Sequence, residues 1–191
     1  MKRIGILALQ GGYGVHAEHV KRCGACATLV RSAGDLADLD GLILPGGEST
    51  AQWRLIKRFA MGETLSDFVA SGRPLLATCA GLILAASTVT GPTQDAFGWL
   101  DIDVQRNGWG RQISSFEAFA DEASTRPTFG AAALPMMFIR APRITRTGPD
   151  VHVLGTYRDE AVLIRQGVFF GATFHPELST DLRIHRHVFD L

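Results

Sequence analysis

The stretch Pro74-Leu75-Leu76-Ala77-Thr78-Cys79-Ala80-Gly81-Leu82-Ile83 decides the fold class. Its first half is a short apolar run typical of a buried strand, and the small residues after it begin a helix. A buried strand that turns directly into a helix is the repeating unit of α/β proteins. Cys79 stands at the turn, so the sequence places a nucleophilic side chain at the carboxyl end of a strand.

This turn is similar to the nucleophile elbow of hydrolases, with Cys in place of Ser. The bend is tight and needs small neighbours, which Ala77, Ala80 and Gly81 supply. A helix N-terminus favours a thiolate and offers N–H groups to a developing oxyanion. The alternative is that Cys79 is a small hydrophobic core residue.

Outward from the elbow, apolar runs and helical stretches alternate through the first half of the chain. We predict strands at 3–9, 27–31, 41–44 and 75–78, and helices at 15–23, 49–59, 63–70 and 80–86, with Ser49 or Thr50 capping the second helix. This alternation predicts a central, mostly parallel sheet with helices on both faces, in three layers.

The second half of the chain reads instead as closely spaced strands separated by turn signals. We predict strands at 101–105, 112–119, 136–140, 151–157, 161–165 and 168–174, a surface loop at 123–135 and a helix at 178–189. The short spacings favour hairpins, and hence an antiparallel extension of the sheet. No repeat or linker divides the chain, so residues 1–191 are expected to form one domain.

His175-Pro176-Glu177 supplies a base and an acid at the end of the predicted strand 168–174. Pro176 biases His175 towards an extended backbone, in which residues i and i+2 point to one side. Glu177 can then hold one ring nitrogen of His175 while the other faces a thiol. The alternative is a surface turn with two solvated side chains.

Pro45-Gly46-Gly47-Glu48-Ser49-Thr50 lies between a predicted strand and a predicted helix. Paired glycines let the backbone approach a ligand closely, and their N–H groups can cradle an oxyanion or a carboxylate. The segment lacks the lysine of a phosphate-binding loop. The alternative is an ordinary turn before a capped helix.

Composition excludes several classes of protein. Of 191 residues, 46% are hydrophobic and 20% are charged, which excludes a disordered chain. The formal net charge of +0 argues against steering onto nucleic acid or an anionic membrane. No apolar run is long enough to span a bilayer. The odd count of 3 cysteines argues against a disulfide scaffold and favours a reducing cytoplasm.

Together these segments resemble the class I (triad) glutamine amidotransferases and, within them, the glutaminase subunits of pyridoxal 5′-phosphate synthase. The supporting stretches run from the first predicted strand to the last helix: Leu7-Ala8-Leu9-Gln10-Gly11, Gln105-Arg106-Asn107, Gly110-Arg111-Gln112, Ser115-Phe116-Glu117, Arg140-Ala141-Pro142 and Phe174-His175-Pro176-Glu177-Leu178. The resemblance implies a flavodoxin-like domain with a central mostly parallel sheet and an antiparallel extension.

The resemblance also implies an activity, hydrolysis of glutamine to glutamate and ammonia through a γ-glutamyl thioester. Cys79 would be the nucleophile, His175 the base and Glu177 its orienting partner. The implied glutamine-binding residues are Gly47, Glu48, Ser49, Arg106, Ile139 and Arg140, and the implied oxyanion donors are the N–H groups of Gly47 and Ala80. Ammonia would pass to a synthase partner that makes pyridoxal 5′-phosphate, with no cofactor or metal in this chain.

Three other functions are compatible with parts of the sequence. A glutaminase of another pathway, such as histidine biosynthesis, would share the triad. A cysteine hydrolase acting on peptides or small aldehydes would share the elbow but would not need Arg106 and Arg140. A dinucleotide-binding module without enzymatic activity would use Gly12-x-Gly14-x-x-Ala17, which fits the dinucleotide fingerprint, although Arg31 stands where an acidic residue is expected. In the resembling family, Gly usually occupies the position of Ala77.

Overall fold

The computed structural model of the protein describes residues 1–109 and 115–191. Residues 110–114 lie outside the described residues. They include the quoted Gly110-Arg111-Gln112 and the first part of the strand predicted at 112–119.

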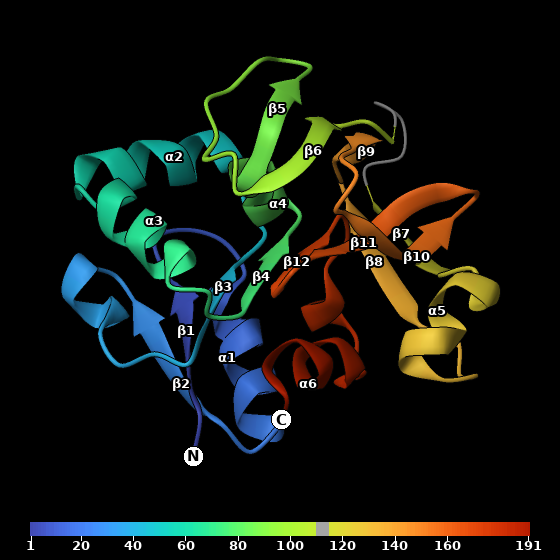
Figure 1. Ribbon diagram of the computed structural model, residues 1–191, viewed down its shortest axis with the longest axis horizontal. Helices are drawn as coiled ribbons and strands as arrows, with labels where there is room; N and C mark the ends of the chain where they lie inside the picture. Colours follow the sequence, from blue (N-terminus) through green and yellow to red (C-terminus); the bar gives the residue numbers. More distant parts are fainter. Residues whose placement is uncertain (110–114) are drawn as a thin grey trace.

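A seven-stranded sheet organises the described part of the chain, in the order β10-β11-β12-β4-β3-β1-β2 (Figure 1). Its strands are β1 (Arg3–Leu7), β2 (Cys26–Val30), β3 (Gly41–Leu44), β4 (Leu75–Thr78), β10 (His152–Tyr157), β11 (Glu160–Gln166) and β12 (Phe169–Ala172). The run β2-β1-β3-β4-β12 is parallel throughout, whereas β11 is antiparallel to β12 and to β10. The predicted parallel sheet with an antiparallel extension is therefore confirmed.

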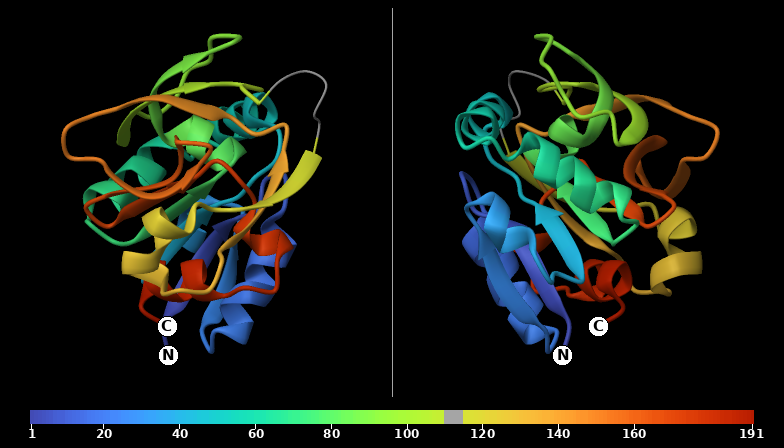
Figure 2. Two further views of the ribbon diagram at one scale, coloured as in Figure 1. Left: turned by 90° about the vertical axis from the view of Figure 1, so that its right-hand side faces the viewer. Right: turned by 60° about the vertical axis from the view of Figure 1, so that its left-hand side comes forward.

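Helices cover both faces of this sheet. They are α1 (Tyr13–Arg22), α2 (Ser49–Arg58), α3 (Gly62–Ala70), α4 (Ala80–Ala85) and α6 (Arg183–Phe189). Figure 1 shows α2 and α3 grouped on one side of the strands and α1 and α6 on the other. In both views of Figure 2 the two ends of the chain lie close together, where Lys2 Nζ donates to the Phe189 carbonyl at 2.8 Å.

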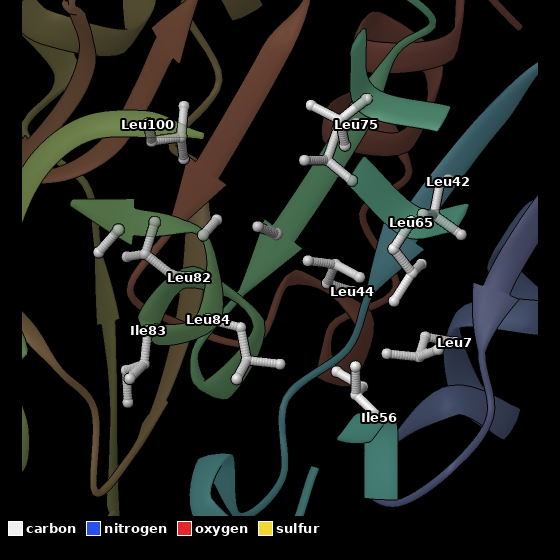
Figure 3. Packing of buried hydrophobic residues seen from close by; sticks show 14 of the residues in the cluster. Leu7, Leu42, Leu44, Ile56, Leu65, Leu75, Leu82, Ile83, Leu84 and Leu100 are labelled. Carbon is white, nitrogen blue, oxygen red and sulfur yellow. The ribbon is translucent and has the colours of Figure 1, made fainter. Parts of the chain in front are cut away.

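Alternating strand residues feed two separate cores. Leu42 and Leu44 of β3 pack with α2, α3 and α4, whereas Ile43 between them packs with α1 and α6. Figure 3 shows the first core, in which leucines from several strands meet the apolar side chains of α4. This two-sided burial explains why the strands read as continuous apolar runs. Among the described helices, none is both long and apolar enough to cross a membrane.

The described residues also form two smaller sheets. One contains β5 (Ala86–Thr90), β6 (Leu100–Gln105) and β9 (Arg143–Thr147); the other pairs β7 (Ser115–Phe119) with β8 (Pro135–Ile139). Strands β5 and β9 were not predicted. Both are short and flank the predicted strand β6, on which they depend for their pairing.

The loop predicted at 123–135 is wrong over its first half, which forms α5 (Glu122–Phe129). Pro127 inside this segment disfavours a helix locally. Contacts with β10 compensate for it. The Thr156 hydroxyl donates to the Asp121 carboxylate at 2.8 Å, and the Thr156 N–H donates to Ser124 Oγ at 2.9 Å. Tertiary contacts of this kind override weak propensity.

Two predicted helix ends are also wrong. The terminal helix begins at Arg183 rather than at residue 178, after a short 3-10 turn at Pro176–Leu178. The Asp181 carboxylate accepts from the Arg183 N–H at 2.9 Å, at the point where the helix begins. Helix α2 is capped by the Glu48 side chain rather than by Ser49 or Thr50.

Candidate active site

Cys79 occupies a sharp turn between β4 and α4. Its backbone has φ 47° and ψ −104°, a conformation that costs about 1–3 kcal/mol for a residue with a Cβ. The Cys79 N–H donates to the Ala172 carbonyl of β12 at 2.9 Å. A side chain at Gly81 would overlap the Leu44 carbonyl, so α4 can begin this close to β3 only with glycine there. The predicted strand–turn–helix geometry of an elbow is present.

His175 follows β12, the strand next to β4, and so lies at the same edge of the sheet as Cys79. Its N–H donates to the Met137 carbonyl of β8 at 2.8 Å, which fixes the backbone at this point. The ring Nδ1 lies 2.8 Å from Glu177 Oε1. Both side chains are buried, with only 10% of the His175 side chain and 1% of the Glu177 side chain exposed.

Electrostatics favours a charged imidazole at this position. Burial lowers the pKa of His175, but the interactions with Cys79 and Glu177 outweigh it and raise that pKa to about 10. Burial raises the pKa of Glu177, whereas His16 and His175 lower it, and the net shift is downward. The carboxylate therefore stays ionised beside the ring, the arrangement needed to stabilise an imidazolium.

Cys79 and His175 open into a cavity of about 270 Å³. Its wall combines backbone, thiol, imidazole, carboxylate and guanidinium groups, and it is lined by Gln10, Gly47, Glu48, Ser49, Cys79, Ile83, Arg106, Asn107, Ile139, Arg140 and His175. The Cys79 sulfur lies 3.8 Å from the Ile139 carbonyl. The cavity thus contains every predicted site residue except Glu177, which lies behind His175, and Ala80, the first residue of α4.

Glu48 and Arg106 carry opposite charges on the cavity wall. Arg106 Nη2 lies 3.3 Å from Glu48 Oε1, and the same carboxylate accepts from the N–H groups of Thr50 and Ala51 at 3.0 and 2.7 Å. Burial raises the pKa of Glu48, but these N–H donors and Arg106 outweigh it, and the net shift is downward. An ionised carboxylate and a guanidinium suit the ammonium and carboxylate of an amino acid.

The glycine pair gives the cavity its shape. A side chain at Gly46 would overlap the His175 ring, and one at Gly47 would overlap the Gln10 amide. The Glu48 N–H donates to Gln10 Oε1 at 2.8 Å, so Gln10 holds this loop in place. Backbone N–H groups at such a close approach are the type of donor that stabilises an oxyanion.

Gln10, Asn107 and Ile83 line the cavity, although they were not among the predicted site residues. Gln10 follows β1, a neighbour of β3 in the parallel sheet, and the shared edge at the carboxyl ends of parallel strands could have indicated it. Asn107 and Ile83 carry no comparable signal.

The glycines of the candidate dinucleotide fingerprint lie at the start of α1, beside the triad. The Gly12 N–H donates to the Gly46 carbonyl at 3.0 Å, and a Cβ at Gly12 would lie 3.3 Å from Glu177 Oε1. This turn therefore packs against the candidate active site. That packing supplies a structural reason for glycine at position 12, whereas a Cβ at Gly14 would meet no other atom within 4 Å.

The fold is that of a glutamine amidotransferase. A crystal structure of a glutamine amidotransferase matches it with a TM-score of 0.89 and 38% sequence identity, covering 98% of this chain and 97% of that chain. The chain belongs to the SNO glutamine amidotransferase family, whose model matches residues 6–190.

Similar relatives carry the name pyridoxal 5′-phosphate synthase subunit PdxT. The relative from Shouchella clausii is 46% identical over 184 residues, which cover 96% of this chain and 92% of the relative. The relative from Geobacillus thermodenitrificans is 44% identical over 189 residues, covering 99% and 94%. The predicted family is confirmed.

Proposed function

We propose that this chain is the glutaminase subunit of a pyridoxal 5′-phosphate synthase and that Cys79, His175 and Glu177 form its catalytic triad. Family membership and nearly full-length relatives of that name support the function. The observation that carries the chemistry is the placement of Cys79 and His175 at adjacent strand ends, facing one cavity, with Glu177 on the ring nitrogen.

The reaction begins when the Cys79 thiolate attacks the carboxamide carbon of glutamine. Backbone N–H groups at Gly47 and Ala80 take up the negative charge on the oxygen. His175 gives its proton to the departing ammonia, which leaves a γ-glutamyl thioester on Cys79. His175 then accepts a proton from water, whose attack on the thioester releases glutamate and restores the thiolate.

The cavity wall supports recognition of a free amino acid. Arg106 and Arg140 offer guanidinium groups to the α-carboxylate, and Glu48 offers a carboxylate to the α-ammonium. Ser49 and the backbone of Gly47 and Ile139 lie within the same wall and would contact the rest of the substrate. A peptide hydrolase would not need this paired charge, which favours glutamine over the peptide alternative.

The proposal includes transfer of ammonia to a synthase subunit that makes pyridoxal 5′-phosphate. Free ammonia would be lost to water, so coupling of hydrolysis to docking of the partner is physically favourable. We also propose that residues 1–191 act as one domain, located in the cytoplasm. Pairing of β12 with β4 supports the first statement, and the three cysteines, all of them free, support the second.

The test is glutamate release from glutamine, with and without a synthase subunit from a related organism. Cys79→Ala should abolish release, and His175→Asn should reduce it to a similar extent, because both act on one chemical step. Cys26→Ser is the matched control, since Cys26 is exposed and outside the cavity. Normal turnover by Cys79→Ala would refute the mechanism.

The partner is tested separately. Cys79→Ala should still co-purify with the synthase subunit, since Cys79 is buried and the change removes only a sulfur atom. Wild-type activity that responds only to the synthase of another pathway, such as histidine biosynthesis, would refute the partner and leave the triad intact.

A further inference from the structure

Three buried histidines lie behind the proposed triad, outside the cavity. His16 and His19 come from α1 and His185 comes from α6, and they are 0%, 3% and 0% exposed. Within the described residues, no group of acidic, histidine or cysteine side chains is arranged to hold a metal ion. The glutaminase reaction described above gives these imidazoles no role.

His16 lies between Glu177 and Thr78, the residue that precedes Cys79. Its Nε2 lies 3.2 Å from Glu177 Oε2, the oxygen that does not face His175. The same nitrogen lies 3.3 Å from the hydroxyl of Thr78, the residue before the nucleophile. Glu177 Oε2 is buried and has no aligned hydrogen bond. Its contact with His16 is therefore electrostatic, and the strength of that contact depends on which ring nitrogen of His16 carries the proton.

The second nitrogen of His16 contacts another imidazole. His16 Nδ1 lies 3.0 Å from His185 Nε2, and the His185 ring also packs edge-on against His19, with centroids 4.8 Å apart. Burial lowers the pKa of His16 to about 4 and that of His185 well below its usual value, despite the attraction of Glu177 for a charged His16. Both rings are therefore neutral near pH 7, with one N–H each.

One assignment of these protons is consistent with an ionised Glu177 and with the contacts of His16 to Thr78 and His185. An ionised Glu177 accepts only, so the His16 proton belongs on Nε2, facing the carboxylate and the Thr78 hydroxyl. His16 Nδ1 is then a bare acceptor and takes the Nε2–H of His185. This leaves His185 Nδ1 without a proton, and that atom is buried with no hydrogen-bond partner. An orphaned acceptor is less costly than an orphaned N–H, so the observed orphan supports the assignment.

We propose that His16 is a positioning residue for the triad: its Nε2–H faces the outer oxygen of Glu177 and the Thr78 hydroxyl, and His185 sets its tautomer. The inference rests on the proposed function of Cys79, His175 and Glu177. His16 stabilises the Glu177 carboxylate as a neutral dipole, so it adds no positive charge that would compete with the His175 imidazolium. His19 packs against His185 on the side away from His16, and it is faced by Arg22 and Asp181.

The first test compares His16→Leu with His16→Gln, in a Cys23→Ser/Cys26→Ser background that leaves Cys79 as the one thiol. Leucine removes the donor, whereas the glutamine amide restores an N–H near the Nε2 position. Glutamate release in the presence of a synthase subunit should show kcat lowered roughly tenfold in His16→Leu, because a close electrostatic contact with the Glu177 carboxylate is lost, with KM unchanged. His16→Gln should recover most of it.

A second readout uses this chain alone and needs no partner. The rate of Cys79 alkylation by iodoacetamide is followed against pH in the same variants. A weakened Glu177 stabilises the His175 cation less, so the midpoint of the profile should move up by roughly one pH unit in His16→Leu. It should stay in place in His16→Gln and in the exposed control His152→Gln. Superimposable profiles and equal kcat in His16→Leu would overturn the proposal.

Two further measurements cover the case in which His16→Leu does not fold. His185→Leu should shift the alkylation profile in the same direction but less, with His185→Gln restoring it. Nitrogen-15 NMR of the wild-type histidine rings should show His16 as the Nε2–H tautomer, and an Nδ1–H tautomer would overturn the inference. Glutamate release that persists in Cys79→Ala would instead refute the triad itself, so the two failures are distinct.

Discussion

At the scale of single residues, the site depends on how closely backbone approaches the imidazole. Gly46 leaves no room for a Cβ beside the His175 ring, because the added atom would overlap Cε1. The hydrogen bond from the His175 N–H to the Met137 carbonyl ties the His175 backbone to β8 and so restricts movement of the ring away from Gly46. His175 is therefore held from two sides.

This packing makes Gly46→Ala a sharp test. The added methyl should displace the ring from Cys79, and kcat/KM for glutamine should fall about 100-fold, as expected for a shift of about 1 Å at a reacting group. Thermal unfolding and glutamine hydrolysis are measured together.

Gly14→Ala is the matched control. Gly14 lies in α1, and a methyl group added there would have no other atom within 4 Å, so alanine should leave activity unchanged and slightly favour the helix. Equal activities of Gly46→Ala and the wild type would show that His175 does not need this position.

At the scale of elements, α2 illustrates how one side chain serves both fold and site. Glu48 accepts from the first N–H groups of the helix and also pairs with Arg106 in the cavity. A carboxylate at a helix N-terminus is favoured by the helix dipole. Helix α3 begins with Glu63 in its first turn, yet its N-cap position makes no side-chain cap.

Glu48→Ala should lower the free energy of unfolding by about 1 kcal/mol through loss of the cap, and should raise KM for glutamine. Glu63→Ala is the control and should change the free energy of unfolding by less than about 0.5 kcal/mol. Urea unfolding and steady-state kinetics measure the two effects. A loss of unfolding free energy in Glu63→Ala as large as that in Glu48→Ala would indicate that a negative charge near the helix start, rather than the Glu48 cap, causes the effect.

The elements that sequence patterns predicted are those whose signal is local. The elbow at Cys79 needs only a few adjacent residues, and the structure has it. The predicted contact of Glu177 with His175 is also present, but it is made across the 3-10 turn at Pro176–Leu178 and not along the extended segment that was predicted. Helix α5 was missed because its support comes from Thr156, far along the chain. The contact of His16 with Glu177 was likewise invisible, since it joins α1 to the end of the chain.

At the scale of the whole molecule, the buried histidines make stability depend on pH. Burial holds the pKa of His16 at about 4, against an ordinary value of 6.5. Between these values the unfolded chain binds a proton that the folded chain does not, so the free energy of unfolding falls as the pH drops from 6.5 towards 4. His185 acts in the same direction.

The loss of unfolding free energy attributable to His16 should reach about 3 kcal/mol as the pH falls from 6.5 to 4. Urea unfolding at several values between about pH 7 and pH 4.5 measures the slope. His16→Gln should flatten it, whereas the exposed His152→Gln should leave it as in the wild type. Identical slopes in all three proteins would show that His16 is protonated to the same extent in both states.

Strand β12 enters the sheet beside β4 although a long stretch of the chain lies between them in sequence. A ribosome therefore releases the segment carrying Cys79 long before it makes the one carrying His175. Until β12 docks, the thiol has no partner to take or give a proton. Under the proposed mechanism, a chain that lacks β12 and His175 would carry the thiol without its base and would not hydrolyse glutamine.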